Sequence, residues 1–329
     1  MTGVRMMSGS VVVTGCAGFI GSNLVDSLLA KGHAVVGIDN LRTGSMENLR
    51  DAQTHAAFAF YREDICGTRL KKCLPTEIDA LFHLAAVSSV KLSVKDPRYV
   101  NRVNVGGTVN LLDAARKHDT RRVIFSSSAA VYGNPTAMPV TEGHPLNPVS
   151  PYAASKVAGE EYVRSFAATY GIETTVLRYF NVYGPRQHLS EYSGVVSIFV
   201  NQALSDRPIT VEGDGGQSRS LVFVDDVVRA TILSAQAPAA AGRTMNIAGN
   251  SSITIVDLAR MIKDGVVGCD SQIIHTPPRV GDVRESAGST ELIASVLGFK
   301  PEIALEEGIS RTIDWFRSKR TSADAPRSL

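Results

Sequence analysis

Short runs of β-branched and aliphatic residues alternate along this chain with longer segments in which apolar residues recur every three or four positions. Ile20, Leu24 and Leu28 show the helical spacing after the first apolar run, and residues 105–112 show it again. This alternation predicts an α/β fold, in which helices cover both faces of a doubly wound parallel sheet. The predicted strands are Val11–Thr14 and residues 34–38, 57–61, 80–84, 122–126 and 173–178.

The pattern changes after Asn181. Residues 182–219 and 251–329 carry more glycine, proline and isolated charge, whereas residues 221–249 return to apolar runs. A chain of 329 residues is long enough for one large domain and a smaller one. The predicted large domain is 1–181 plus 221–250, and the predicted smaller C-terminal lobe, which closes over the sheet, is 182–220 plus 251–329.

The first predicted strand runs directly into three spaced glycines, Gly15, Gly18 and Gly21, and a helical pattern follows. Gly15 permits a tight turn, Gly18 lets a pyrophosphate approach the backbone, and Gly21 lets the helix pack against the strand. The helix N-terminus then faces the anion. In this context the motif predicts a Rossmann-type dinucleotide site, and an ordinary tight turn between strand and helix is the alternative.

Asp39 ends the second predicted strand, eighteen residues after Gly21. A carboxylate there can accept hydrogen bonds from both ribose hydroxyls of an adenosine and would repel a 2′-phosphate, which favours NAD over NADP. Arg42 nearby could reverse that preference, but a solvated loop arginine is the favoured interpretation. Asp64 follows the third strand and is placed either to meet the adenine edge or to cap a turn.

The segment around Tyr152 predicts an acid–base pair for hydride transfer. Ser150 and Pro151 favour the start of a helix, which puts Tyr152 and Lys156 on one face. A lysine cation beside a phenol, helped by a positively charged nicotinamide ring, favours the phenolate and brings the pKa of the tyrosine toward neutrality. Serines 126–128 follow a predicted strand just upstream, at an edge of the sheet where ligands bind.

With these motifs the chain resembles the extended short-chain dehydrogenase/reductases, and within them the UDP-sugar 4-epimerases. The resemblance covers nearly the whole chain in the family's order and implies a Rossmann domain with a smaller substrate-binding lobe, NAD as cofactor and a UDP-sugar as substrate. The matching segments are GCAGFIG at 15–21, DN at 39–40, HLAA at 83–86, SSSAAVYG at 126–133, SPYAASK at 150–156, RYFNVYGPRQ at 178–187, GDGGQSRS at 213–220 and RVGDVRES at 279–286.

The resemblance also implies roles for single residues. Ser128 and Tyr152 contact the sugar's 4-hydroxyl, and Lys156 holds the nicotinamide ribose, which makes these three the catalytic residues. The residues implied for the cofactor are Gly15, Gly18, Phe19, Ile20, Gly21, Asp39, Asn40, Asp64, Ile65, Leu84, Ala85, Ala86, Asn104, Tyr152, Lys156 and Tyr179. Those implied for the substrate are Ser88, Ser128, Tyr152, Phe180, Asn181, Arg186, Arg219, Arg279, Asp282 and Ser286.

Four of the substrate residues, Asn181, Arg219, Arg279 and Asp282, are implied to bind the nucleotide and its diphosphate, although either arginine could instead form a surface ion pair. The chain departs from the family at two places. Ser220 stands where the family usually has Asp after the arginine, which puts the hold on Arg219 in doubt. Ser289 stands where an Asp often begins a late helix, and serine is a comparable N-cap.

Two alanines narrow the predicted reaction. Related 4,6-dehydratases and decarboxylases carry an acid where this chain has Ala129 or Ala130, and elimination of water needs a general acid and base there. Epimerisation through a 4-keto sugar needs no such group. The alternatives are a UDP-glucuronate 4-epimerase, with Arg186 as the partner of the sugar carboxylate, another NAD-dependent nucleotide-sugar-modifying enzyme, or a catalytically silent NAD-binding sensor.

Ser286 bears on which sugars fit. In the family the residue four places beyond the Asp of the RxGD segment lines the pocket beside the sugar's C2 substituent. Here that Asp is Asp282, so the residue is Ser286. A small side chain there implies room for N-acetyl sugars alongside glucose and galactose. The alternative is that Ser286 faces away or caps a turn.

Composition adds expectations about partners and location. The net charge of +2 offers no electrostatic footprint for nucleic acid, and no stretch approaches the roughly 18 apolar residues of a membrane span. The four cysteines lie far apart in the sequence, which predicts reduced thiols in a cytoplasmic protein. The histidines are scattered, so we do not expect a metal site. The family expectation is a C2 homodimer built on the helices at 106–118 and Pro151–Tyr170.

Overall fold

A parallel sheet of seven strands forms the centre of the protein in the computed structural model, which describes residues 7, 9–188, 194–278 and 283–324. Its strand order is β11-β6-β5-β4-β1-β2-β3, and every neighbouring pair is parallel. The predicted α/β fold is therefore confirmed. The strands are β1 (Val11–Thr14), β2 (Val35–Asp39), β3 (Phe58–Arg62), β4 (Ala80–His83), β5 (Arg122–Ser128), β6 (Glu173–Tyr179) and β11 (Thr244–Ile247).

The strand order reverses between β1 and β4, and the loops that follow these two strands meet at the carboxyl edge of the sheet. A Cβ on Gly15 would lie only 2.8 Å from the amide nitrogen of Ala85, which shows how closely the two loops approach. Ligands of open α/β sheets bind in the crevice at such a switch point. The topology therefore places the predicted dinucleotide loop where a ligand would be expected.

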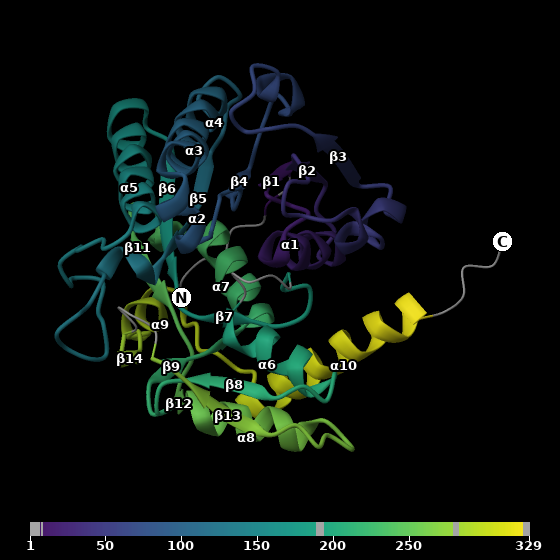
Figure 1. The fold of residues 1–329 in the computed structure, drawn as a ribbon. Coiled ribbons are helices and arrows are strands. Elements are labelled where there is room, and N and C mark those ends of the chain that lie inside the picture. The colour runs from purple at the N-terminus through teal and green to yellow at the C-terminus, as the bar shows by residue number, and fades with distance from the viewer. Residues whose placement is uncertain (1–6, 8, 189–193, 279–282, 325–329) are drawn as a thin grey trace.

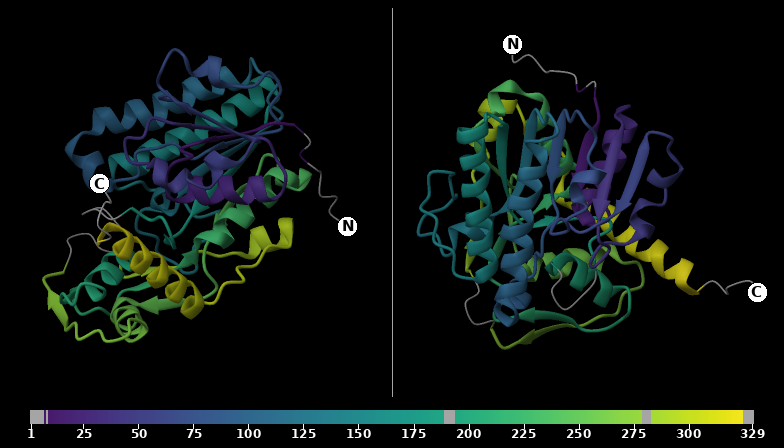
Figure 2. Two further views of the ribbon diagram at one scale, coloured as in Figure 1. Left: turned by 90° about the vertical axis from the view of Figure 1, so that its right-hand side faces the viewer. Right: turned by 90° about the horizontal axis from the view of Figure 1, so that it is seen from above.

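Helices cover both faces of this sheet (Figures 1 and 2). On one face lie α1 (Phe19–Ala30) and α7 (Val224–Gln236), which pack against each other. On the other face lie α4 (Thr108–Ala115) and α5 (Pro151–Tyr170), with α2 (Val90–Lys95) and α3 (Pro97–Asn101) packed on α5.

The helix expected at 106–118 differs from the prediction, because α4 begins at Thr108 and continues from a π-helical segment at Arg102–Gly107. Such wide turns often occur at functional sites. This one carries Asn104, whose side chain it turns toward the loop after β4.

Most of the remaining elements lie below the central sheet in the view of Figure 1. They form three small sheets, β7–β10, β8–β13 and β12–β9–β14. The strands are β7 (Val182–Tyr183), β8 (Ile209–Glu212), β9 (Ser218–Ser220), β10 (Val222–Phe223), β12 (Ser252–Thr254), β13 (Ile273–Thr276) and β14 (Glu285–Ser286). The helices are α6 (Val195–Ala203), α8 (Ile255–Gly265), α9 (Glu291–Leu297) and α10 (Leu305–Asp324), and short 3-10 turns lie at Met46–Leu49, Ala52–Thr54, Leu70–Cys73, Ala129–Tyr132 and Pro238–Ala240.

The strand pairings bear on the division into lobes. β11 joins the edge of the central sheet although it follows residues 182–220 in the chain, whereas β8 and β9 pair with strands from beyond residue 250. On these pairings we propose the division 1–181 plus 221–250 and 182–220 plus 251–329.

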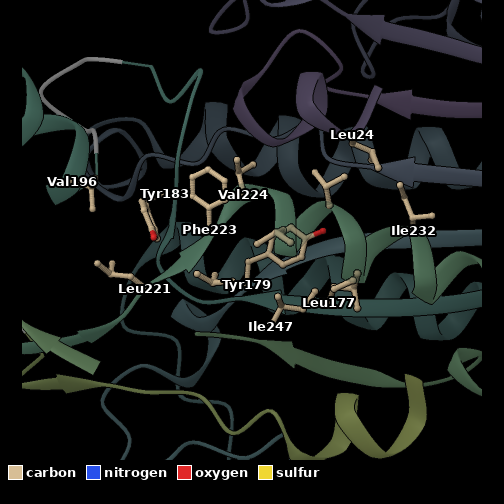
Figure 3. Close-up of a cluster of buried hydrophobic side chains, with 14 of the residues drawn as sticks. Leu24, Leu177, Tyr179, Tyr183, Val196, Leu221, Phe223, Val224, Ile232 and Ile247 are labelled. Carbon is tan, nitrogen blue, oxygen red and sulfur yellow. The ribbon is translucent and has the colours of Figure 1, made fainter. Parts of the chain in front are cut away.

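One hydrophobic cluster runs from the central sheet into the smaller sheets (Figure 3). Tyr179 of β6 lies in it together with Tyr183 of β7, and the Phe223 ring packs edge-on against Tyr183 with the ring centroids 5.4 Å apart. Val196 of α6 belongs to the same cluster. Burying a side chain of this size stabilises the fold by about 1.5–3 kcal/mol. The two groups of elements therefore share a core.

Arg122 at the start of β5 is a buried cation, only 2% exposed, that holds the end of α7. Its Nη1 donates hydrogen bonds to the carbonyl oxygens of Ser234, Ala235 and Ala237, at 3.2, 3.1 and 2.6 Å. Its Nε and Nη2 donate to one carboxylate oxygen of Glu173, at 2.9 and 2.5 Å. The last carbonyls of a helix have no partners within it, so this side chain supplies the missing donors.

We expect Arg122→Met to lower the free energy of unfolding by about 3 kcal/mol, because it leaves buried carbonyls and a carboxylate without donors. Denaturant unfolding of the purified protein measures the change. Arg116→Met is the control, since Arg116 forms an exposed pair with Asp113 and its loss should cost no more than about 1 kcal/mol. Equal losses for the two variants would contradict the role given to Arg122.

Candidate active site

The glycine-rich loop between β1 and α1 has the shape that a dinucleotide needs. Gly15 adopts φ +71°, and a Cβ on Gly21 would lie 2.1 Å from the Gly15 carbonyl oxygen, so the loop packs too tightly for any side chain at these positions. Gly18 is the N-cap of α1, no side chain caps this terminus, and the first turn holds no acid. The first-turn N–H groups, which include those of Phe19 and Ile20, thus point to a place for an anion.

Asp39 at the end of β2 is 9% exposed and lies beside this loop. Its carboxylate accepts the Ala17 N–H at 3.0 Å and the Leu41 N–H at 2.8 Å. Burial raises the pKa of Asp39, and these two hydrogen bonds oppose the rise. Arg42 stacks over the Tyr99 ring, 4.3 Å from its centroid, rather than over Asp39.

Asp64 is engaged in a turn. It accepts the Cys66 N–H at 2.8 Å and a hydrogen bond from the Asn40 side-chain amide at 2.8 Å. Burial alone would raise the pKa of Asp64, but these hydrogen bonds bring it below its usual value. The structure therefore supports the turn interpretation of Asp64, with the buried Ile65 directly after it.

Asn104 lies behind the loop that follows β4, which contains Leu84, Ala85, Ala86 and Ser88. Its Oδ1 accepts the Val87 N–H at 2.7 Å, and its Nδ2 donates to the Val87 carbonyl at 3.0 Å and to Ser155 Oγ at 2.9 Å. These bonds give Asn104 a supporting role in the loop, and its contact with the cofactor stays a prediction. Asn104 ties the loop to α5.

Tyr152 and Ser128 come together where α5 crosses the end of β5. The Ser150 hydroxyl caps α5 by accepting the Ala153 N–H at 3.2 Å, which sets the first turn and the direction of Tyr152. The Ser128 side chain lies close to the Tyr152 hydroxyl and lowers its pKa, against the larger effect of burial. Sequence reasoning placed these residues at the same edge of the sheet, and the structure brings them into contact.

Lys156 lies one turn further along α5 and is 5% exposed. Its Nζ donates to the Ser126 carbonyl oxygen at 2.8 Å and lies 5.2 Å from the centroid of the Phe125 ring. Burial lowers the pKa of Lys156 to about 8, an effect that the Glu160 carboxylate partly offsets.

Lys156 is not among the protein groups that shift the pKa of Tyr152. Burial raises the pKa of Tyr152, and the opposing influence is the Ser128 side chain. The ammonium group of Lys156 donates to the Ser126 carbonyl. The prediction joined the lysine with the positively charged nicotinamide ring, and their combined effect on this pKa stays a prediction.

A cavity of about 470 Å³ opens beside Ser128. Its wall combines the ends of the central strands with the short strand β14, so it lies where the sheet meets the smaller elements. Ser286 accepts a hydrogen bond from the Asn181 side chain at 3.3 Å in this wall. The lining residues are Ser88, Ser128, Ala129, Ala130, Tyr132, Gly133, Pro135, Val140, Tyr179, Phe180, Asn181, Val182, Arg219, Val283, Glu285 and Ser286.

A second cavity of about 420 Å³ adjoins the first, and the two share Asn181, Val182 and Arg219. Arg219 is held in place by backbone, because its Nη1 donates to the carbonyl oxygens of Ser218 and Val283, at 2.8 Å each. Ser220 donates instead to the Gly249 carbonyl at 3.0 Å. The serine that replaces the family's Asp therefore leaves Arg219 fixed by other groups.

Arg186 follows the short strand β7 and precedes Gln187, which lines the second cavity. The Arg186 side chain pairs with Asp26 of α1 at 2.6 Å and lines neither cavity, which leaves the predicted contact with a sugar carboxylate without support. Two further predicted substrate residues, Arg279 and Asp282, lie outside the described residues. Ser289 accepts the Glu291 N–H at 3.3 Å just before α9, although the N-cap position itself is Thr290.

Comparisons with known proteins match this fold and cleft to one family. Residues 11–248 match the model of the NAD dependent epimerase/dehydratase family. The chain belongs to this family. It is an enzyme of the NAD-dependent kind, and its cofactor is NAD. The loop and Asp39 described above fit that cofactor.

Individual members of the family are similar over nearly the full length. A UDP-glucose 4-epimerase from Mycolicibacterium smegmatis is 44% identical over 310 residues, which cover 94% of this chain and 98% of the relative. The structure of a UDP-glucose 4-epimerase from Thermotoga maritima with UDP-glucose has a TM-score of 0.89 at 36% identity and covers 94% of this chain and 99% of that one. A UDP-N-acetylglucosamine 4-epimerase from Methanobrevibacter ruminantium, in complex with UDP-N-acetylmuramic acid, has a TM-score of 0.90 at 38% identity, over 95% and 100% of the two chains.

Sequence reasoning missed several residues near the site. Tyr132 and Glu285 line the first cavity, and Glu160 is fully buried beneath the catalytic pair. The four-residue spacing from Lys156 to Glu160 on one helix was a signal that could have identified the glutamate. Glu285 gave no comparable signal, because its place in the wall depends on the pairing of β14 with β9.

No helix among the described residues is long and apolar enough to cross a membrane. Within the same ranges, no group of three or more His, Cys, Asp and Glu side chains is arranged to hold a metal ion.

Asp39 generates a prediction about cofactor choice. We expect denatured protein to release NAD(H) and not NADP(H). We expect Asp39→Asn to weaken NAD binding by up to about 3 kcal/mol and to narrow the preference for NAD over NADP, because the substitution removes a charge that favours ribose hydroxyls. Calorimetric titration of cofactor-free protein with both nucleotides measures this. Asp51→Asn, an exposed acid, is the control and should leave both affinities unchanged. Tighter binding of NADP by the wild-type protein would overturn the assignment.

Proposed function

We propose that this chain is a UDP-sugar 4-epimerase that interconverts the gluco and galacto configurations of UDP-glucose and UDP-galactose and also of their N-acetyl forms. The observation that carries the proposal is the neighbouring Tyr152 and Ser128 side chains beside a cavity whose adjoining wall is Ala129 and Ala130. Such a site holds an acid–base pair for one hydroxyl and no second pair for eliminating water. The names of the family members similar to this chain support the same reaction.

In the proposed mechanism the chain's own residues manage a single proton. The Tyr152 oxygen takes the proton from the sugar's C4 hydroxyl and returns it when C4 is reduced, while Ser128 fixes that hydroxyl through its own hydrogen bond. Bound NAD would supply the hydride acceptor and donor, held by Gly15, Gly18 and Asp39. Burial favours the neutral phenol of Tyr152. During turnover the Lys156 cation would stabilise the phenolate.

The two adjoining cavities fit the two parts of such a substrate. We assign the sugar to the cavity at Ser128 and the nucleotide to the cavity lined by Gln187 and Phe199. Arg219, which lines both, is placed to meet the diphosphate between them, because a guanidinium group suits bidentate contact with phosphate.

The structure favours this substrate class over a UDP-glucuronate. The arginine proposed as partner of a sugar carboxylate, Arg186, is paired with Asp26. The charged residues lining the sugar cavity, among the described residues, are Arg219 and Glu285, and the carboxylate of Glu285 would repel a second one. A catalytically silent sensor is also disfavoured, because a sensor would not need Tyr152 and Ser128 side by side.

We also propose that the protein forms the C2 homodimer predicted from α4 and α5, and that it acts in the cytoplasm. Helix α5 exposes Tyr162 and Tyr170, 42% and 50% exposed, in keeping with a surface that a second copy would cover.

The experiment that tests the function is incubation with UDP-glucose, UDP-galactose and their N-acetyl forms, followed by chromatographic separation of the epimers. We expect Tyr152→Phe to lower turnover by roughly 10²–10⁴-fold, because it keeps the ring but removes the proton carrier. The fold and the bound NAD should survive, as circular dichroism and the absorbance of released cofactor would show. Near-normal turnover in this variant would exclude Tyr152 as the acid–base group.

Ser286 generates a separate prediction about sugar choice. Its small side chain lines the sugar cavity beside Asn181, so Ser286→Tyr should fill space there. We expect the N-acetyl substrates to lose about 1–3 kcal/mol in kcat/KM through overpacking, while glucose and galactose are spared. The measurement is kcat/KM for both sugar pairs in both proteins. Equal losses on all four substrates, or no wild-type activity on N-acetyl sugars, would leave a plain UDP-glucose 4-epimerase.

A further inference from the structure

The face of α5 that meets the sheet carries three polar side chains spaced one helical turn apart: Tyr152, Lys156 and Glu160. All three are buried. Each contacts a different one of the last three residues of β5, so the helix holds the end of this strand at consecutive positions. The contacts are Tyr152 with the Ser128 side chain, Lys156 Nζ with the Ser126 carbonyl at 2.8 Å, and Glu160 Oε1 with the Ser127 hydroxyl, which donates at 2.5 Å.

A glycine lets the helix approach the strand this closely. A Cβ on Gly159 would lie 2.6 Å from Cζ of Phe125, so a larger residue would push α5 away from β5. The three contacts therefore depend on one close packing surface.

Glu160 is the member of this row that the proposed chemistry does not use. It is fully buried, and Arg178 of β6 binds it with two hydrogen bonds, Nε to Oε1 at 2.9 Å and Nη2 to Oε2 at 2.7 Å. Arg178 lies directly opposite Ser127 in the pairing of β5 with β6. The half-exposed Arg164 adds a longer contact at 3.3 Å. An ion pair with Arg178 accounts for the burial of Glu160 but not for its bond to Ser127.

The charges around Lys156 also point to Glu160. From β4 it faces His83, whose pKa is lowered to about 3 by burial and by Lys156, so this ring is neutral. Tyr152 on its own helix and Tyr179 on β6 are phenols with raised pKa values. Within the described part of the chain, Glu160 is thus the anion whose charge acts on the Lys156 ammonium and raises its pKa against the effect of burial.

We propose that Glu160 is a positioning residue of the active site, which holds Ser127 and the adjoining Ser128 against Tyr152 and keeps the Lys156 ammonium charged beside them. The inference rests on the proposed function. It gives Glu160 two separable tasks, one that depends on its reach to Ser127 and one that depends on its charge.

Three substitutions separate these tasks. Glu160→Gln keeps the length and an acceptor for Ser127 but removes the charge. Glu160→Asp keeps the charge but is one methylene too short to reach Ser127. Ser127→Ala removes the hydroxyl and leaves the ion pair with Arg178. Glu161→Gln is the matched control, because it makes the same chemical change on the next residue, which is exposed and also contacts Arg164.

For Glu160→Gln we expect the basic limb of the kcat/KM profile to move to lower pH by roughly one unit, because Lys156 loses its proton more readily without the anion. For Glu160→Asp and Ser127→Ala we expect kcat to fall about tenfold with little change in KM and no shift of the limb, since the Ser128 backbone is misplaced but the charge remains. Glu161→Gln should match the wild type in every measurement.

A readout without turnover accompanies the kinetics. Titration of the Lys156 side chain in cofactor-free protein, followed by NMR, should show a pKa about 8 in the wild type and a lower one in Glu160→Gln. This titration still tests the inference if the wild type epimerises no UDP-sugar, which would contradict the proposed function instead.

A folded Glu160→Gln protein with the wild-type pH profile and an unchanged Lys156 titration would overturn the charge task. If that variant does not fold because Arg178 is left without its anion, Glu160→Asp and Ser127→Ala decide. Unchanged kcat in both of these would overturn the proposal, and so would a fall in thermal stability alone, which would leave Glu160 with a purely structural role.

Discussion

The close contact of α5 with the carboxyl ends of β5 and β6 is the constraint on which both the fold and the site depend. A buried carboxylate and a buried guanidinium, Glu160 and Arg178, lie at its centre. Removing either charge from water costs several kcal/mol, and that cost is offset only when the geometry is good and the remaining donors are satisfied. Here the pairing is bidentate, and Arg178 also donates to the Tyr132 hydroxyl at 2.9 Å, which in turn donates to Asn246 of β11 at 2.7 Å. The network therefore ties three strands and one helix together beneath the residues that do the chemistry.

Much of the fold could be predicted because its signals are local. The bounds of α5 follow from Ser150 as cap, Pro151 in the first turn and Gly171, which ends the helix at φ +73°. The strands follow from apolar runs, with errors of one or two residues at their ends. The π-helical segment at Arg102–Gly107 could not be predicted, since its wide turn is selected by the bonds of Asn104 to a distant loop and not by periodicity.

In the candidate site, too, local features could be predicted and long-range contacts could not. Residues inside a motif, such as Gly15 or Tyr152, could be identified because the motif itself carries the geometry. Contacts between distant segments could not: nothing in the sequence pairs Arg186 with Asp26, 160 positions away, whereas the family resemblance implied a substrate role for Arg186. The burial of Tyr152, which raises its pKa, also could not be predicted, because it depends on how α5 packs against the sheet.

The residues that we propose for the chemistry and for the choice of sugar belong to different parts of the chain. The Tyr152–Ser128 pair belongs to the central sheet and its helix, whereas Ser286 belongs to a two-residue strand that pairs with β9. Asn181 links the two, since its side-chain amide donates both to the Ser220 carbonyl at 3.1 Å and to Ser286 at 3.3 Å. Substitutions on β14 can therefore reshape the far wall of the sugar cavity without entering the packing of α5 on β5. If the proposed roles hold, an enzyme built this way can change its substrate through the peripheral strands while the buried Glu160–Arg178 network keeps the proton-transfer geometry constant.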